Sequence, residues 1–330
     1  MSPISLARFT AGPLGRGLAS TEMSRLTVLI CTHNRAALLA KTLDSLNGAE
    51  RPAGWSVQVF VAANACSDAT HAFLDEYRAH ANDRGDLPLT WFAEPIPGKS
   101  NALNSALPQI GGEIVAFVDD DHRVDAGYLV AVCQGAETFP EATLFCGRIL
   151  PDWDGSEPDW VHDSGPYRIY PLPVPRFDQG DIPREITPDV AIPGGGNLFL
   201  RVPWLSRVGP FATDMGPTGH DLGGAEDLDW VLRALHLGAR LYYIPNVVQY
   251  HYVDPSRLTL GYLMRKAFKR SASTIRIDSV KAGVPGYLYR KVAAYGFKAL
   301  TAFRKPRRRF YLVRTAAALG EIVGHLQPRR

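Results

Sequence analysis

Three consecutive carboxylates, Asp119, Asp120 and Asp121, directly follow an apolar run from Ile114 to Val118. The run is β-branched or aromatic at nearly every position, which is typical of a strand buried on both faces of a parallel sheet. Adjacent anions at the end of such a strand repel one another, and a divalent cation or a cationic partner offsets that repulsion. Because hard oxygen ligands favour Mg²⁺ or Mn²⁺ over zinc, the run predicts a metal site. A solvated acidic loop is the alternative interpretation.

A second acidic pair, Glu226 and Asp227, opens a segment whose apolar residues recur at helical spacing. Two interpretations are open for this pair. Glu226 can raise the pKa of Asp227 by like-charge repulsion, which would suit acid–base chemistry. The pair can also simply stabilise the helix N-terminus through its dipole, and the two effects are compatible.

Alternating strands and helices must position these acids. Apolar runs with strand character alternate with segments of helical spacing. This alternation predicts an α/β protein with a doubly wound, mostly parallel sheet flanked by helices, whose ligands lie beyond the carboxyl ends of the strands. The predicted strands are 26–31, 57–62, 89–93 and 114–118, and the predicted helices are 35–46, 69–80, 100–107 and 125–138.

The pattern changes after a further predicted strand at 143–149. Residues 151–193 are rich in Pro, Trp, Asp and Tyr without a clear period, which predicts a long loop that is either functional or disordered. A short polar segment, Gly194 to Asn197, then opens a predicted strand at 198–202. Two further strand-like runs, 241–244 and 247–250, end at His251.

The charge of the chain is unevenly distributed. The net charge is +3, but residues 256–330 hold 18 of the 36 Lys and Arg and only two of the 33 acidic residues, a net charge of +16. An acidic body with a basic tail argues against a protein that coats nucleic acid and for a tail with an anionic partner of its own.

The tail is predicted to form basic amphipathic helices at 258–272, 287–303 and 311–326, with a basic linker at 304–309 between the last two. None of these segments has the roughly 18 to 20 uninterrupted apolar residues of a membrane span. Such helices suit an anionic membrane surface, and packing on the catalytic domain is the alternative.

The cysteines and the N-terminus predict a cytoplasmic protein. The four cysteines form no CxxC pair, as expected for reduced thiols. The first 22 residues contain Arg, Pro and Gly rather than a continuous apolar core, so they do not resemble a signal peptide. We expect residues 1–24 to be a disordered extension, and the protein to be cytoplasmic or peripheral on the inner face of the membrane.

Taken together, five ordered motifs resemble those of family 2 glycosyltransferases, over roughly residues 25 to 270. The motifs are Thr32-His33-Asn34-Arg35, Asn64-x-Cys66-Ser67-Asp68-x-Thr70, Gly98-Lys99-Ser100-Asn101-Ala102-Leu103-Asn104, Asp119-Asp120-Asp121 and Glu226-Asp227. Their order and spacing carry the resemblance more than any single motif. It implies a GT-A (Rossmann-like) catalytic domain at 25–255, with 256–330 as a basic helical tail. It also implies a nucleotide-sugar donor, Mg²⁺ or Mn²⁺, and transfer with inversion to a saccharide or lipid-linked acceptor.

The resemblance also assigns residue roles. Asp121 is the expected metal ligand, with His251 as a second metal or phosphate contact. Asp227 is the expected base, with Glu226 beside it. Expected donor contacts are Thr32, Asn34, Arg35, Asn64, Asp68, Lys99, Asn101, Asn104, Asp119 and Asp120. Gly195, Gly196, Asn197 and Trp230 are expected on the acceptor side, where the loop 151–193 can form a lid.

One departure from the family pattern concerns the donor base. Family members commonly have an aspartate that recognises the base directly before the asparagine of the second motif, and this chain has Ala63 there. The identity of the base is therefore open. A milder departure is His33, where tyrosine is usual.

Two other functions fit some of these motifs. A nucleotidyltransferase also needs metal-binding carboxylates at strand ends, but it would normally carry a Gly-rich phosphate loop after the first strand, and Thr32 to Arg35 is not Gly-rich. A catalytically silent, membrane-associated protein that binds nucleotide sugars or glycans would have no need of a base such as Asp227.

Overall fold

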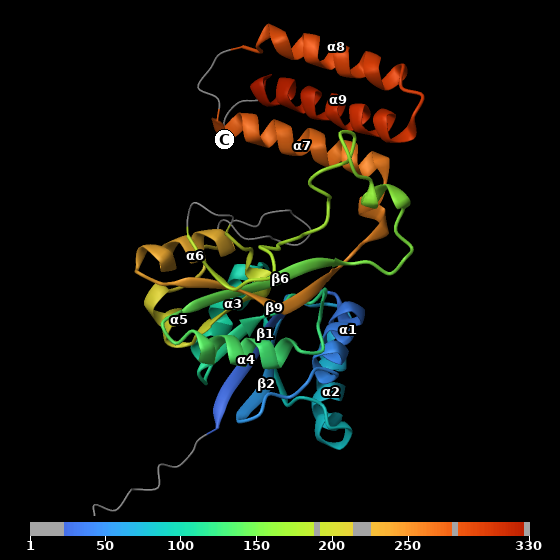
Figure 1. Cartoon of the computed structure of the whole chain (residues 1–330). Coiled ribbons are helices and arrows are strands. Elements are labelled where there is room, and N and C mark those ends of the chain that lie inside the picture. The colour runs from blue at the N-terminus through green and yellow to red at the C-terminus, as the bar shows by residue number, and fades with distance from the viewer. Residues whose placement is uncertain (1–22, 188–191, 214–225, 279–282, 327–330) are drawn as a thin grey trace, which may run out of the picture.

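The computed structural model describes residues 23–187, 192–213, 226–278 and 283–326 (Figure 1). It contains a single large sheet flanked by helices and, joined to it, a layer of three C-terminal helices. The predicted α/β fold with a helical extension is therefore confirmed. Most of the predicted extension, residues 1–22, lies outside the described residues, and β1 begins at Ser24.

The first half of the sheet follows the predicted alternation. The strands are β1 (Ser24–Thr32), β2 (Trp55–Asn64), β3 (Leu89–Glu94) and β4 (Ile114–Phe117), and the intervening helices are α1 (Ala36–Asn47), α2 (Thr70–Arg84) and α3 (Lys99–Ala106), which continues into the 3₁₀ turn η1 (Leu107–Gln109). These four strands pair in parallel in the order β3-β2-β1-β4, so their carboxyl ends share one edge.

The second half of the sheet is mixed. Its strands are β5 (His122–Val124), β6 (Leu144–Asp152), β7 (Arg184–Ile186), β8 (Leu198–Arg201) and β9 (Leu241–Tyr252), with helices α4 (Tyr128–Thr138), α5 (Pro203–Val208) and α6 (Glu226–His236). The sheet continues β4-β8-β6-β9-β5, and β7 pairs with β9. Only β6 and β9 are parallel here, whereas β8, β5 and β7 run antiparallel to their neighbours.

The sheet is buried on both faces, as predicted for its central strands. Alternate residues of β1 enter different cores: Leu26, Val28 and Ile30 join the cluster beneath α1, α2 and α4, whereas Leu29 joins the cluster with α3, α5 and α6. This alternation follows from the period of two along a strand. The central strands are therefore packed on both faces, which fixes the positions from which the loops at their ends begin.

Two predicted strands are one. The runs 241–244 and 247–250 belong to β9, which continues through Pro245 and Asn246. The register of β6 against β9 shifts between Cys146 and Arg148, and a side chain at Gly147 would collide with the backbone carbonyl of Val247. Four residues of β9, from Ile244 to Val247, thus lie opposite Gly147 alone, and this irregularity accommodates Pro245 within the strand.

Three other segments differ from the predictions. The loop 151–193 is not wholly irregular, because β6 extends to Asp152 and the segment contains the 3₁₀ turn η2 (Asp159–His162) and β7. The three-residue strand β5 was not predicted. The basic cluster 304–309 is not a linker, because α9 (Lys305–Leu326) includes all of it except Arg304.

The C-terminal layer consists of α7 (Leu260–Asp278), α8 (Gly286–Leu300) and α9, with α9 between the other two (Figure 1). β9 leads into α7 through the 3₁₀ turn η4 (Pro255–Leu258). Lys291 and Glu321 form a salt bridge between α8 and α9, with Nζ 2.7 Å from Oε1. No helix of the described residues is long and apolar enough to cross a membrane.

Candidate active site

The acidic run lies where the sheet rule predicts, directly beyond the carboxyl end of β4. Lys99, the first residue of α3, faces it, with Nζ 2.8 Å from Asp119 Oδ1. Burial would raise the pKa of Asp119, but the attraction of Lys99 lowers it well below its ordinary value. Asp119 is therefore a carboxylate with one cationic partner and a partly exposed side chain.

Asp120 points the other way, into the protein. Its Oδ2 accepts a hydrogen bond from Thr32 Oγ1 at 2.7 Å, and its Oδ1 lies 2.9 Å from Arg35 Nη1. Burial and the neighbouring Asp121 raise the pKa of Asp120 to about 6, although Arg35 and Thr32 oppose this. The predicted donor contacts of Asp120 and Thr32 are therefore not supported, because both side chains are buried and bind each other. They hold the loop that carries Asp119 and Asp121.

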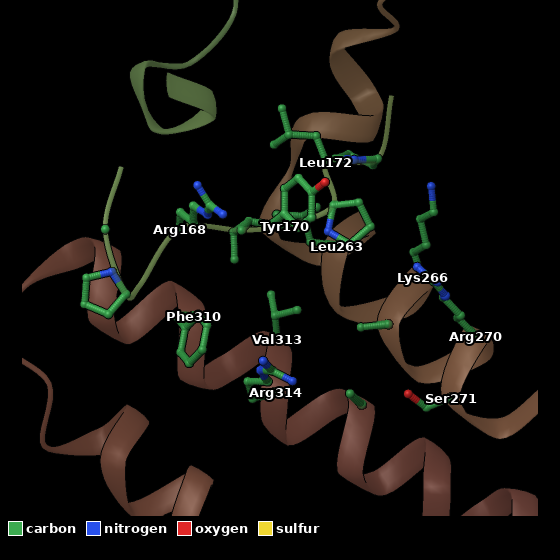
Figure 2. A pocket seen from close by; sticks show the side chains of 17 residues that line it. Arg168, Tyr170, Leu172, Leu263, Lys266, Arg270, Ser271, Phe310, Val313 and Arg314 are labelled. Carbon is green, nitrogen blue, oxygen red and sulfur yellow. The ribbon is translucent and has the colours of Figure 1, made fainter. Parts of the chain in front are cut away.

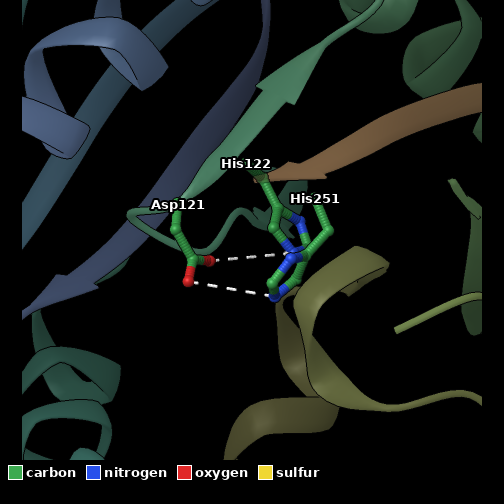
Figure 3. A group of neighbouring side chains, drawn as sticks. All are labelled: Asp121, His122 and His251. Carbon is green, nitrogen blue, oxygen red and sulfur yellow. Dashed lines mark ion pairs between the residues drawn. The ribbon is translucent and has the colours of Figure 1, made fainter. Parts of the chain in front are cut away.

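A candidate metal centre is formed by Asp121, His122 and His251, whose ligand atoms all lie within 4.8 Å of one another (Figure 3). His122 and His251 are directly opposite residues of the antiparallel pair β5 and β9. Asp121 Oδ2 lies 3.8 Å from His251 Nε2, and Asp121 Oδ1 lies 4.0 Å from His122 Nε2. The structure thus brings together the two predicted ligands and adds His122, which the sequence analysis missed.

The hydrogen bonds around His122 fix which ring nitrogen faces the site. Gln249 Nε2 donates to the backbone carbonyl of Phe117 at 3.1 Å and lies 2.9 Å from the Asn197 Oδ1. The amide oxygen of Gln249 must therefore face His122 Nδ1, 2.5 Å away, so that Nδ1 carries the proton. Nε2 is the ring nitrogen that faces the site, and it is buried and has no hydrogen-bond partner among the described residues.

His251 is oriented in the same way. Its Nδ1 lies 2.6 Å from the backbone carbonyl of Tyr252, which can only accept, so Nδ1 carries the proton and Nε2 faces Asp121. Burial lowers the pKa of His251 despite the attraction of Asp121, which favours the neutral ring. One carboxylate and two imidazole lone pairs, each ring held from behind, form a donor set that fits a divalent cation.

The predicted base, Asp227, lies beside Lys99, the partner of Asp119. Asp227 is in the first turn of α6, and its Oδ2 accepts a hydrogen bond from the Gly195 backbone N–H at 3.0 Å. Lys99 Nζ is 4.0 Å from the same oxygen. Burial lowers the pKa of Lys99, but Asp119 and Asp227 together raise it well above its ordinary value. Lys99 thus remains a cation between the two acidic segments.

Glu226 is nearly inaccessible to solvent, and burial followed by repulsion from Asp227 raises its pKa. Its Oε2 has no hydrogen-bond partner among the described residues. The two acids therefore occupy different environments, and only Asp227 faces Lys99 and Gly195 directly.

Two adjacent glycines in the 3₁₀ turn η3 (Gly195–Asn197) have no room for a side chain. A Cβ on Gly195 would collide with the carboxylate of Asp227. A Cβ on Gly196 would lie 2.5 Å from Asp119 Oδ2 and 3.0 Å from His122 Cε1. Glycine is therefore required at both positions because the backbone passes directly against the candidate base and the acidic run.

The loops after β1 and β2 are cross-linked by polar residues. Asn34, at φ +52°, accepts hydrogen bonds on Oδ1 from the backbone N–H groups of Ser67 and Asp68, at 2.7 and 3.2 Å. Asp68 Oδ2 in turn accepts from the backbone N–H of Ala36. Asparagine suits this position because it tolerates the left-handed conformation. Asn34 and Asp68 thus hold together the loops after β1 and β2, and Arg35 lies in the first of these loops.

Asn64 braces the third loop. Its Oδ1 accepts from the Gly98 backbone N–H at 2.8 Å, and its Nδ2 donates to the Ile96 carbonyl at 2.7 Å. Gly98, at φ +127°, directly precedes Lys99. Asn64 therefore sets the position of Lys99 through the backbone. The preceding residue, Ala63, is completely buried and offers no polar group.

Four predicted ligand contacts have protein partners instead. Asn104 binds the backbone of Phe211 through both amide atoms, and Asn101 donates to the Pro97 carbonyl at 3.0 Å. Trp230 is completely buried, stacks on Phe211, and donates to the Gly209 carbonyl. Asn197 is buried against β6 and β9. Asn197 and Trp230 are buried on these partners and do not face a ligand site, whereas Asn101 and Asn104 are partly exposed, so their ligand contacts stay predictions.

Comparisons with known proteins agree with this geometry. The model of glycosyl transferase family 2 matches residues 27–209. The succinoglycan biosynthesis protein ExoM of Rhizobium meliloti is 25% identical over 262 residues, which span 79% of this chain and 77% of ExoM. A beta-monoglucosyldiacylglycerol synthase of Trichormus variabilis is 34% identical over 107 residues, which span 32% of this chain and 22% of the synthase.

Solved structures share the fold. Residues 1–349 of S. aureus TarS, in complex with UDP, superpose with a TM-score of 0.54 at 18% identity, covering 92% of this chain and 90% of TarS 1–349. The mannosyltransferase PcManGT of Pyrobaculum calidifontis superposes with a TM-score of 0.51 at 20% identity, covering 91% and 88%. The matched family model covers more than half of the chain, including the acidic run and Gly195. The chain therefore belongs to glycosyl transferase family 2 and is a glycosyltransferase of the GT-A fold.

Proposed function

We propose that this glycosyltransferase transfers a sugar from a nucleoside-diphosphate donor to a hydroxyl of a saccharide or lipid-linked acceptor, with inversion and with the help of a divalent cation. The solved relatives support the donor class: TarS was crystallised with UDP and with UDP-GlcNAc, and PcManGT with GDP-Man and Mn²⁺. The names of ExoM and of the glucosyldiacylglycerol synthase support the two acceptor classes.

The cation would be held by Asp121, His122 and His251. Two imidazoles in the donor set favour Mn²⁺ over Mg²⁺, which prefers oxygen ligands. When bound, a divalent cation there supplies electrostatic stabilisation of the charge that develops on the leaving diphosphate. Two positive charges lie nearby: Lys99 pairs with Asp119, and Arg35 pairs with Asp121.

Inversion in one displacement needs a base on the face of the sugar opposite the leaving diphosphate. We assign that role to Asp227, in which the Gly195 backbone N–H binds Oδ2 and Oδ1 would take the proton of the acceptor hydroxyl. Lys99 lies between Asp227 and Asp119, so the base and the diphosphate side of the site share one cation. This bridge from Asp119 through Lys99 to Asp227 is the observation that carries the proposal.

Exchange of the base tests the proposal. We expect Asp227→Asn to bind nucleotide diphosphate as the parent does but to lose at least about 10²-fold in transfer rate, which matches the usual contribution of a general base. Asp229→Asn is the matched control, because Asp229 is on the same helix but pairs with Arg233. Parental turnover by Asp227→Asn would show that the assigned base is wrong.

The products separate the proposal from its alternatives. A transferase releases a nucleoside diphosphate, whereas a nucleotidyltransferase releases pyrophosphate, and a silent binding protein releases neither. The donor can be found by screening nucleotide sugars for a thermal shift in the presence of Mn²⁺, since a ligand that binds the native state raises its stability. The screen is needed because Ala63 stands where family members commonly have the aspartate that recognises the nucleobase of the donor, so the sequence does not identify that nucleobase.

We also propose that the C-terminal layer attaches the enzyme to an anionic membrane surface on the cytoplasmic side. Exposed apolar residues lie along α8 and beyond it, with Phe297 68% and Leu300 84% exposed and Phe303 fully exposed. The exposed Arg304 and Lys305 follow directly. Apolar and basic residues together are typical of interfacial helices. Flotation with vesicles of phosphatidylglycerol at rising salt tests this, and vesicles that leave the protein behind at every salt concentration would refute it.

A further inference from the structure

A cavity lies between the segment 165–173 and the helices α7 and α9 (Figure 2). It has a volume of about 740 Å³, which is in the range of pockets that hold a small molecule. None of the residues to which we assign a role in transfer lines it.

Four cationic residues line this cavity. Lys266 and Arg270 project from α7 one turn apart, Arg314 projects from α9, and Arg168 projects from the segment 165–173 (Figure 2). No acidic residue is among the described residues that line the cavity. Burial, followed by repulsion from Arg257 and Arg270, lowers the pKa of Lys266. Four cationic side chains and no described acidic side chain thus line the cavity, a composition that suits an anionic group.

The rest of the lining is apolar. Leu263 and Ala267 of α7 and Phe310, Val313 and Ala317 of α9 line the cavity. Free inorganic phosphate would use only the cationic residues and leave this surface in contact with water, whereas a neutral lipid would use only the apolar surface. An occupant that uses both has an anionic head group and a hydrocarbon chain.

We propose that this cavity binds a lipid phosphate, with the phosphate against Lys266, Arg270, Arg314 and Arg168 and the alkyl chain against the apolar surface between α7 and α9. The proposal does not depend on the transfer reaction, because neither Lys99 nor Asp227 lines the cavity. It is nevertheless linked to the metal centre along the chain, since α7 begins nine residues after His251.

Binding of decyl phosphate to the full chain, below its micellar concentration and without metal or donor, tests the proposal by calorimetry. We expect saturable one-to-one binding of decyl phosphate. Inorganic phosphate and decyl maltoside, which each carry half of the proposed ligand, should bind at least about tenfold more weakly, since each lacks one set of contacts. Equal binding of inorganic phosphate would identify an anion site only, equal binding of decyl maltoside an apolar site only, and no binding of decyl phosphate would also overturn the proposal.

Paired variants locate the binding. Lys266→Gln should weaken decyl phosphate binding about tenfold, the usual effect of losing one charge-assisted hydrogen bond, whereas Lys269→Gln, an exposed change on the same helix outside the cavity, should have no effect. Ala317→Trp should fill the cavity and abolish binding, whereas Ala293→Trp on the exposed face of α8 should not. Unchanged affinity of Lys266→Gln would overturn the assignment, and this variant keeps the test valid even if Ala317→Trp does not fold.

Discussion

Arg35 Nη1 lies 3.0 Å from Asp121 Oδ2, an oxygen of the carboxylate that faces the two histidines of the candidate metal centre. The same nitrogen is 2.9 Å from Asp120 Oδ1. A single guanidinium therefore offsets the repulsion between two adjacent carboxylates, the role that the acidic run led us to expect of a cation. Arg35 and a metal ion compete for the same carboxylate.

This competition makes a prediction about Arg35→Gln. In the absence of donor, the variant should bind Mn²⁺ several-fold more tightly than the parent, because Asp121 no longer has to leave an ion pair. Calorimetric titration of each protein with Mn²⁺ measures this difference in affinity. Arg78→Gln, which removes an exposed pair with Asp75, is the control and should leave the affinity unchanged. Weaker Mn²⁺ binding by Arg35→Gln would show that Arg35 supports the centre instead.

The three proposed ligands should be needed for metal-dependent donor binding. Asp121→Ala should abolish the increase in nucleotide affinity that Mn²⁺ produces, as measured by calorimetry with and without the ion. The control Asp44→Ala removes an exposed carboxylate of α1 and should have no effect.

His122 provides a separate test because the sequence analysis did not select it. His122→Gln should weaken Mn²⁺ binding by about 10- to 100-fold, and His251→Gln by a similar factor, because each removes one imidazole lone pair. His80→Gln, an exposed change on α2, is the control. An unchanged affinity of His122→Gln would reduce the centre to Asp121 and His251.

The two neighbouring glycines Gly194 and Gly195 should respond differently to the same substitution. Gly195→Ala should lower the transfer rate by about 10²-fold, because the new methyl group displaces the carboxylate of Asp227 and small displacements of a reacting group are costly. Gly194→Ala should retain activity, since a Cβ there meets nothing within 4 Å. Steady-state rates with the identified donor decide between these outcomes, and equal rates for both variants would contradict the proposed contact.

Much of the fold could be predicted from the sequence because the first half of the chain has strong local signals. The strands from β1 to β4 are apolar runs bounded by polar turns, and the helices between them have a clear period. β5 escaped prediction because three residues carry no period. β9 was predicted as two strands because Pro245 and Asn246 interrupt the apolar pattern, and the sequence does not reveal the irregularity opposite Gly147 of β6 that keeps them within one strand.

The site was predicted less completely because sequence shows which residues are near a strand end but not which way they point. Asp119 and Asp120 are adjacent, yet one faces Lys99 and the other is buried on Thr32. His122 follows the acidic run directly, but its meaning depends on the register that sets it opposite His251. The long-range pairing of β5 with β9 supplies that information, and no local pattern contains it.

The packing of the C-terminal layer makes a prediction about stability. A side chain on Gly320 would collide with the backbone of Phe268, so Gly320→Ala should destabilise the packing of α9 on α7 by about 1–3 kcal/mol. Gly296→Ala in α8 meets nothing within 4 Å and should be neutral or stabilising by up to about 1 kcal/mol, because alanine is the better helix former. Thermal unfolding of the two variants measures both effects, and a loss of stability in Gly296→Ala alone would contradict this packing.

The continuity of β9 has a practical consequence for any attempt to shorten the protein. His251 is the next-to-last residue of β9, and only η4 and its short flanks separate it from α7. A truncation that removes the basic helices must therefore cut the chain within a few residues of a proposed metal ligand. Loss of activity in such a truncated enzyme would report damage to the catalytic centre as readily as loss of membrane attachment, so the two can be separated only by point substitutions on the helices themselves.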